Sequence, residues 1–229
     1  MPALNALTQI PPDFVEVRQS AWASAADHHR ARVLHAAAAM LADSASAFVE
    51  DLTATVEEIA VCRACLNESA ALALRSAGRT QHLPGGFMVQ EMERPAGVVA
   101  LIGQRSPTLQ GIVAAVAPAI ARGNACLIVS SGHLDPAIIA LSGLLTEAGA
   151  PPGLIGVVTG PDDTPADRLA TEPGIDAVRF LSSADVSAQV VQAARNAGKR
   201  IDQQPGHDAG RAFGGAACKI KSIWIPTGA

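Results

Sequence analysis

The chain has 229 residues, of which 21 are acidic and 17 basic, and its formal net charge at pH 7 is −4. Charges of both signs are scattered along it, without the basic stripe that binding to a phosphate backbone requires, so nucleic acid is not an expected partner. The longest apolar run, residues 111–121, is too short to cross a bilayer and contains Pro118. Because the first residues also lack the pattern of a secretory signal, we expect a soluble, cytoplasmic protein with no membrane partner.

The chain contains four cysteines, which we expect to be free thiols in a reducing compartment: Cys62, Cys65, Cys126 and Cys218. The first two form a C-x-x-C pattern, but they lie in a helical stretch and no second pair of ligands accompanies them. We therefore interpret both as small core residues, with metal or redox function as the alternative.

The first third of the chain is predicted to be helical. Apolar residues recur every three or four positions from about Ser24 to Leu52, and Ser24 is the predicted N-cap. A second helix is predicted from Thr55 to about Ser76, and its buried side is expected to contain Val56, Ile59, Cys62 and Leu66. The Pro84-Gly85-Gly86 turn follows it, and the alternation over residues 87–92 predicts a strand after that turn.

Strands and helices then alternate along the chain. Short apolar strands are predicted at 98–102, 125–129, 156–159 and 177–181, and helices at 109–121, 136–148, 164–170 and 184–197. This order indicates an α/β fold with a Rossmann-like parallel sheet that has helices on both faces. The first of these strands is not followed by a G-x-G-x-x-G fingerprint. Residues 203–215 are expected to form a loop, and residues 219–226 alternate as in a terminal strand.

Five segments of the chain resemble the aldehyde dehydrogenase superfamily in their order and spacing. They are residues 94–99 (RPAGVV), 117–124 (APAIARGN), 147–153 (EAGAPPG), 157–160 (VVTG) and 175–180 (IDAVRF). Trp22 and the 30–41 helix resemble the N-terminal helices of that family. Gly210-Arg211 and residues 219–226 resemble its extreme C-terminus. The stretch after Gly206 therefore skips the segment that forms the catalytic domain in the family.

This resemblance implies a division of the chain into four parts. Residues 1–84 would be an N-terminal helical part that packs on the Rossmann-like domain, which spans residues 96–206. Residues 85–95 would form an oligomerisation strand, and residues 207–229 a loop and the C-terminal oligomerisation strand. In the family these strands build a small antiparallel sheet that pairs with the catalytic domain of a neighbouring subunit.

The catalytic groups of the family have no counterpart in this sequence, so no catalytic residue is predicted. The segment with the nucleophilic cysteine is missing, and Cys218 leads directly into the terminal strand, although Lys219 and Lys221 could lower its pKa. Arg105 replaces the asparagine that donates to the oxyanion, and Gln204 replaces the general base. Asp202 and His207 beside Gln204 are interpreted as polar loop residues.

The cofactor site of the family is also altered. Residues 129–133 (VSSGH) replace its ribose-binding Lys-Pro-Ser/Ala-Glu, and Phe180-Leu181-Ser182-Ser183 replaces its Phe-Thr-Gly-Ser. The two serines could still donate hydrogen bonds at a helix N-terminus, which favours anions. The residual cofactor-binding candidates are Ile102, Gly103, Ser182 and Ser183. We expect no required cofactor, weak or vestigial NAD(P) binding, and no metal site.

The sequence thus favours a noncatalytic subunit that assembles with a full-length aldehyde dehydrogenase and stabilises or regulates it. Its retained edge strands and missing catalytic groups motivate this hypothesis. Two alternatives remain open. The chain could be an NAD(P)-dependent aldehyde oxidoreductase component with residual nucleotide binding, or a structural domain that associates with itself.

Overall fold

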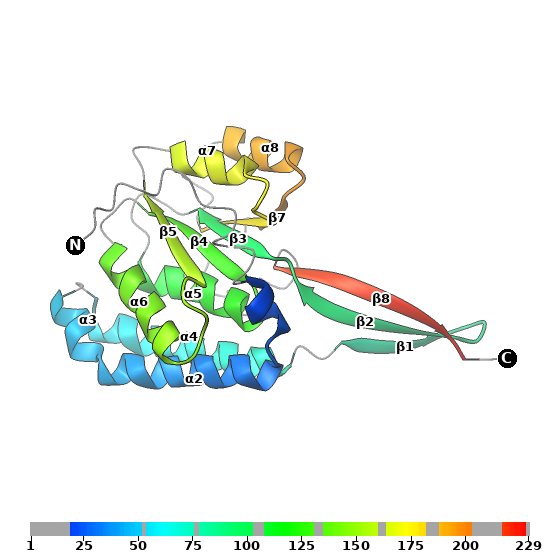
Figure 1. Cartoon of the computed structure of the whole chain (residues 1–229), viewed down its shortest axis with the longest axis horizontal. Helices are drawn as coiled ribbons and strands as arrows, with labels where there is room; N and C mark the ends of the chain where they lie inside the picture. Colours follow the sequence, from blue (N-terminus) through cyan, green and yellow to red (C-terminus); the bar gives the residue numbers. More distant parts are fainter. Residues whose placement is uncertain are drawn as a thin grey trace.

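The computed structural model describes residues 19–51, 54–75, 78–102, 108–130, 135–159, 164–181, 188–202 and 217–227. In this part of the chain, a five-stranded parallel sheet covered by helices continues into a three-stranded antiparallel sheet that projects to one side (Figure 1). The predicted α/β fold, with its parallel sheet and small antiparallel sheet, is confirmed. We call the projecting sheet the arm.

The parallel sheet has the strand order β5-β4-β3-β6-β7. Its strands are β3 (Val98–Ile102), β4 (Ala125–Ser130), β5 (Ile155–Thr159), β6 (Ala177–Phe180) and β7 (Arg200–Asp202). All five residues of β3 are buried, as expected for a central strand that is covered on both faces. The strands found here match the predicted ones within one residue at each end, except that β7 was not predicted.

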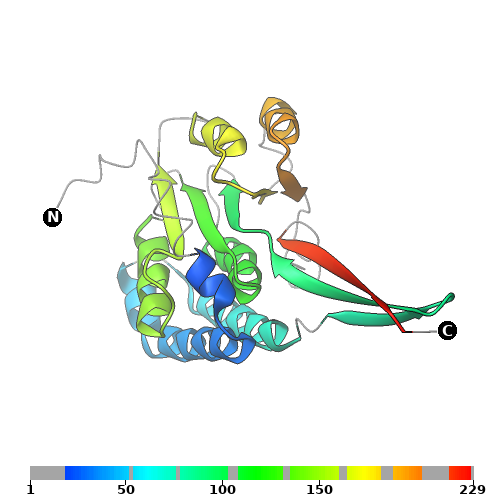
Figure 2. The ribbon, with the colours of Figure 1, turned by 45° about the vertical axis from the view of Figure 1, so that its right-hand side comes forward.

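Helices cover both faces of the parallel sheet (Figures 1 and 2). One face is covered by α5 (Leu109–Ala121) and α6 (Asp135–Glu147), with α2 (Asp27–Asp43) and α4 (Val56–Leu74) packed beneath them. The other face is covered by α7 (Thr164–Thr171) and α8 (Ala188–Asn196). None of the helices in the described ranges is long and apolar enough to span a membrane.

The N-terminal helices differ from the prediction in three details. The first predicted helix is divided at Ser44, and a separate α3 follows over Ala45–Asp51. The N-cap of α2 is Ala26 rather than Ser24, and it makes no side-chain capping bond. On α4, Val56 is 70% exposed, whereas the other three predicted core positions are buried. Val56 is the first residue of that helix, so it lies outside the packed stretch.

The arm consists of β1 (Arg79–Leu83), β2 (Phe87–Pro95) and β8 (Cys218–Pro226), in the order β1-β2-β8. All pairs are antiparallel, and β8 runs beside β2 over its whole length. The sequence had not predicted β1, because its polar, exposed residues show no alternation between buried and exposed positions. The N-terminal helical part, residues 1–84, therefore also contains a strand near its end.

Asn124 joins the arm to the parallel sheet. Its side chain is fully buried, and its Oδ1 accepts a hydrogen bond from the Gly97 amide at 3.0 Å. Its Nδ2 donates to the Ala119 carbonyl at 2.9 Å and to the Ala217 carbonyl at 3.0 Å. One amide side chain thus connects the β2–β3 junction, the end of α5 and the residue that precedes β8.

Gly97 lies at the junction in a conformation that favours glycine, with φ of +132°. A Cβ atom on this residue would lie 1.9 Å from Oδ2 of Asp176. That oxygen accepts a hydrogen bond from the Val98 amide at 3.0 Å, and Oδ1 of the same carboxylate is 3.1 Å from the Lys219 ammonium. Asp176 therefore forms a second link between the parallel sheet and β8.

Replacing Asn124 with alanine should destabilise the protein by about 3 kcal/mol, because the buried Gly97 amide loses its acceptor and two carbonyls lose a donor. Urea unfolding followed by circular dichroism measures this change. As a control, Gln192→Ala removes an exposed side-chain hydrogen bond to Asn196 and should cost less than about 0.5 kcal/mol. Equal costs for the two substitutions would contradict the linking role of Asn124.

Candidate functional site

The carboxyl ends of the parallel strands are where open α/β sheets bind ligands. Of the predicted cofactor-binding residues, Ile102 is the one that lies in a described range, at the end of β3. It is 3% exposed, and its carbonyl accepts a hydrogen bond from the Leu181 amide at 2.9 Å. Its neighbours across the sheet are Val129 and Phe180.

The other predicted candidates, Gly103, Ser182 and Ser183, lie outside the described residues. The same holds for Arg105, Gln204 and His207, which replace or flank the catalytic groups of the resembling family. The structure therefore does not test whether these residues come together. It places the end of β3 between the ends of β4 and β6.

Three residues at the ends of β3, β4 and β6 have no polar side-chain group that could bind the ribose of a dinucleotide. Ile102, Val129 and Phe180 have purely apolar side chains, and Ile102 and Phe180 are buried. None of these three side chains can hydrogen-bond to the hydroxyl groups of a ribose. A side-chain hydrogen bond to a dinucleotide at this edge would have to come from other residues.

A buried ion pair lies near this edge. Nη1 of Arg179 is 3.8 Å from Oδ2 of Asp202, and both side chains are less than one-tenth exposed. Burial lowers the pKa of Arg179, and the negative charge of Asp202 acts in the opposite direction. Asp202 is thus a buried residue of β7 and not the polar loop residue that the sequence suggested. The feature of the sequence that could have indicated this ion pair is Arg179 itself, because it is the one charged residue in the otherwise apolar strand β6.

The four cysteines are free thiols, and none resembles an activated nucleophile. Burial raises the pKa of Cys62 and Cys126 to about 12, and that of Cys65 to about 11. Cys62 is fully buried and Cys65 is packed against the core, which confirms their interpretation as core residues. No group of three potential metal ligands occurs among the described residues.

Cys218, the first residue of β8, is 4% exposed, and its Sγ is 3.9 Å from Oε2 of Glu93. Burial raises the pKa of this thiol to about 11, although Arg122 and Arg200 act to lower it. The prediction that Lys219 and Lys221 could lower the pKa of Cys218 is wrong. Burial has the largest effect on this pKa, and the charged groups that act on the thiol are Arg122, Glu93 and Arg200. Nucleophilic catalysis needs a thiolate near neutral pH, so Cys218 does not fit this role.

Apolar side chains are exposed on one face of the arm. Ile220 is 66% exposed, Trp224 62% and Phe87 41%, and the Trp224 and Phe87 rings are in edge contact at 6.3 Å between centroids. The pairing register places these three residues on the same face of the arm. Large apolar groups gathered on a projecting sheet are typical of protein–protein contacts.

Comparisons with known proteins agree with this geometry. The sequence profile of the aldehyde dehydrogenase family matches residues 15–207. The chain is 25% identical to betaine aldehyde dehydrogenase of Amaranthus hypochondriacus and 29% identical to human 4-trimethylaminobutyraldehyde dehydrogenase. These matches cover 81% and 75% of this chain but 39% and 36% of the relatives, so the chain spans less than half of their length.

Solved structures show a similar fold. A benzaldehyde dehydrogenase of Corynebacterium glutamicum, titled as NAD-dependent, superposes with a TM-score of 0.73 at 25% identity over 85% of this chain and 45% of that one. A Sinorhizobium meliloti protein, solved with NAD and described as a methylmalonate-semialdehyde dehydrogenase, gives 0.76 at 27% identity over 85% and 41% of the two chains.

The raised thiol pKa values predict that the protein loses stability at alkaline pH. The native state keeps these thiols protonated, whereas the unfolded state releases the protons above the ordinary value of 9.0. The contribution of the protonated thiols to the free energy of unfolding is fully present below pH 9. It is lost as the pH rises toward 11 to 12, by about 1 kcal/mol per pH unit for each cysteine. Urea unfolding at several pH values measures the slope. Cys62→Ala should reduce the slope above pH 9 and leave it unchanged below pH 8, and identical slopes for both proteins would contradict this account.

Proposed function

Because the chain belongs to the aldehyde dehydrogenase family, we propose that it acts as a noncatalytic subunit that assembles with a full-length aldehyde dehydrogenase and stabilises or regulates it. The observation that carries this proposal is the open edge of β8, with which no described strand pairs. Two further features of the described residues support it.

The first feature is the short connection between the parallel sheet and the arm. β7 ends at Asp202 and β8 begins at Cys218, so only residues 203–217 connect them. The sequence resemblance implies that a catalytic domain occupies this position in the chain of full-length members. A connection of this length leaves no room for such a domain between β7 and β8.

The second feature is the state of the thiols. The family resemblance implies a cysteine nucleophile, and all four cysteines of this sequence have pKa values raised to about 11 or 12. At neutral pH such thiols are protonated and poorly nucleophilic. This chemistry supports a role in assembly rather than in catalysis.

The hydrogen-bond pattern defines the open edge of β8. The Ala96 amide donates to the Ala217 carbonyl and the Thr227 amide donates to the Gly86 carbonyl, so odd-numbered residues of β8 bond to β2. The backbone groups of the even-numbered residues point away from β2. Among these, the Cys218 carbonyl accepts a hydrogen bond from Nη1 of Arg200 at 2.9 Å. The next three along the edge are Ile220, Ser222 and Trp224.

No described strand pairs with this edge of β8. Its outward N–H and C=O groups can therefore form a ladder with a strand of another subunit. Ile220 and Trp224 lie on this strand and expose apolar surface, which an added subunit would cover. The combination of open backbone groups and exposed apolar side chains supports a partner that adds a strand to β8.

Ser222→Pro should weaken assembly with the full-length aldehyde dehydrogenase about tenfold or more. Proline removes the outward N–H of residue 222 and places its ring at the open edge, but it leaves the bonds between β8 and β2 in place. Co-expression of the two chains, followed by light scattering coupled to size-exclusion chromatography, measures complex formation. Ser222→Ala is the matched control, because it keeps the backbone donor.

Two outcomes would decide against the proposed subunit role, and a third would decide against the proposed contact. A wild-type chain that stays monomeric and ignores the partner would reject it. A stable homo-oligomer that does not take up the partner would favour the self-associating structural domain instead. Equal complex formation by Ser222→Pro and Ser222→Ala would show that the open edge of β8 is not the contact.

The alternative of residual nucleotide binding is motivated by the solved relatives, of which one is described as NAD-dependent and another was solved with NAD. Our proposal expects at most weak binding, because residues 129–133 (VSSGH) lack the ribose-binding lysine and glutamate of the family, and the side chains of Ile102 and Phe180 supply no substitute. Calorimetric titration with NAD(H) and NADP(H) should therefore give no saturable heat at millimolar concentration. A full-length aldehyde dehydrogenase serves as the positive control, and saturation in the micromolar range would favour the cofactor-binding component.

A further inference from the structure

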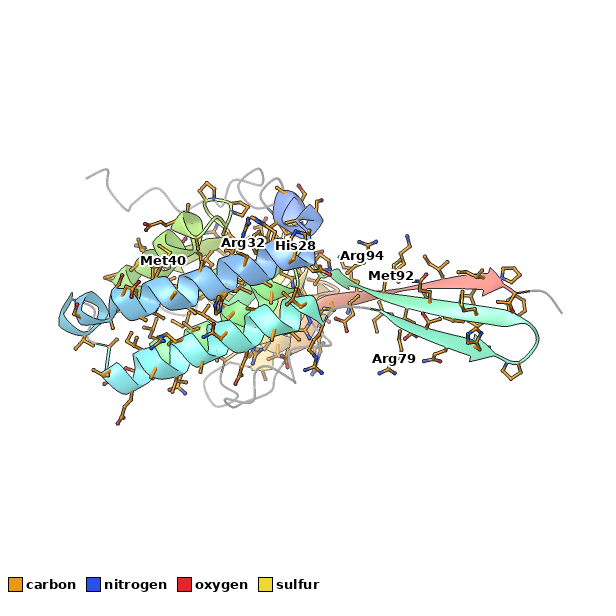
Figure 3. The ribbon with its side chains drawn as sticks, turned by 90° about the horizontal axis from the view of Figure 1, so that it is seen from below. His28, Arg32, Met40, Arg79, Met92 and Arg94 are labelled. Atoms are coloured by element: carbon orange, nitrogen blue, oxygen red, sulfur yellow. The ribbon has the colours of Figure 1, made fainter. Side chains whose placement is uncertain are left out.

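A cleft of about 380 Å³ lies at the root of the arm, where β2 meets the start of α2. The cleft is at the amino ends of β3 and β4. The predicted cofactor residues are instead at or directly after the carboxyl ends of their strands. Figure 3 shows Met92 and Arg94 of β2 at this root, near the beginning of α2. The charged and thiol residues that line the cleft are Asp27, Arg30, Glu93, Arg94, Arg122 and Cys218.

Arg122 has unmet hydrogen-bonding capacity in this cleft. It is the C-cap residue of α5, and its side chain is only 8% exposed. Its Nε is 3.7 Å from Oε2 of Glu93, which is close enough for an ion pair but too far for a hydrogen bond. Among the described residues, its buried Nε and Nη1 atoms have no hydrogen-bond partner. Buried guanidinium donors without a hydrogen-bond partner reduce the stability of the protein, and a ligand with an acceptor group would remove this cost.

Arg30, on the opposite wall, is by contrast fully engaged. Its Nε donates to the Ala121 carbonyl at 3.1 Å, and its two Nη atoms bond to the Trp22 and Ala25 carbonyls and to the Asp27 carboxylate. This guanidinium fixes the start of α2 against the end of α5. The charges of Arg30 and Asp27 therefore neutralise each other, and the net charge of the cleft is set by its other charged residues.

The remaining charges favour an anion. Arg122 and the exposed Arg94 carry two positive charges, and Glu93 supplies one negative charge. Burial raises the pKa of the Cys218 thiol to about 11, so this group is neutral at physiological pH. The described residues include no cluster of ligands for a metal ion. One positive charge is left without a counterpart.

We propose that this cleft binds a small molecule that carries a phosphate or carboxylate group, with Arg122 as its buried anchor and Arg94 at the rim. Arginine suits this task because its planar guanidinium donates two parallel hydrogen bonds to either oxyanion. The volume of the cleft lies within the range of small-molecule sites. Glu93 is a competitor in this arrangement, because its carboxylate lies next to the Nε of Arg122.

Inorganic phosphate and malonate are the probes, each titrated by calorimetry at constant ionic strength set with NaCl. The wild-type chain should bind at least one of them saturably, and Arg122→Gln should weaken this binding at least tenfold. Arg79→Gln is the matched control, because Arg79 is an exposed arginine of the arm that does not line the cleft. It should change the affinity less than twofold. Binding of phosphate alone identifies a phosphate-bearing ligand, and binding of malonate alone identifies a carboxylate.

Glu93→Gln provides a test that does not depend on the folding of the Arg122 variant. Removal of the competing carboxylate should tighten anion binding at least threefold, whereas Arg94→Gln should weaken it about as much. The proposal is overturned if the wild-type chain binds neither probe saturably, if Arg79→Gln loses as much affinity as Arg122→Gln, or if Glu93→Gln weakens binding.

Discussion

The buried amide of Asn124 holds together three parts of the chain that are far apart in sequence. Through its contacts with the Gly97 amide and the Ala119 and Ala217 carbonyls, it joins the β2–β3 junction, the end of α5 and the start of β8. A polar side chain is tolerated at such a buried position only when its donors and acceptors are paired. The junction between the arm and the parallel sheet therefore depends on the hydrogen bonds of this residue, together with the second link through Asp176.

Two surface features follow from that anchorage. β8 is fixed beside β2 in a single register, which leaves its outward backbone groups and Trp224 exposed along the arm. The same junction brings the Arg122 side chain, at the end of α5, under Glu93 of β2 and forms the cleft at the root. The proposed assembly edge and the proposed anion site thus share one structural origin.

The sequence predicted the elements whose residues follow a strong pattern, such as β3 and α5, which match to the residue. It did not predict β1 or β7, because β1 is polar and exposed and β7 is only three residues long. Periodicity also cannot reveal Arg122 as an unpaired buried donor, because its surroundings come from β2 and β8. The cofactor candidates at the end of β3 came from the family resemblance, and of these the structure places Ile102 alone.

The central claim is that the edge of β8 is held open for another subunit. Hydrogen–deuterium exchange of the backbone amides of β8, measured with and without a full-length aldehyde dehydrogenase, tests it directly. In the chain alone, the amides of Ile220, Ser222 and Trp224 should exchange fast, whereas those of the odd-numbered residues, which bond to β2, are protected. Addition of the partner should slow the even-numbered set selectively. If the partner leaves these amides unchanged, or if both sets exchange alike in the free chain, the account is contradicted.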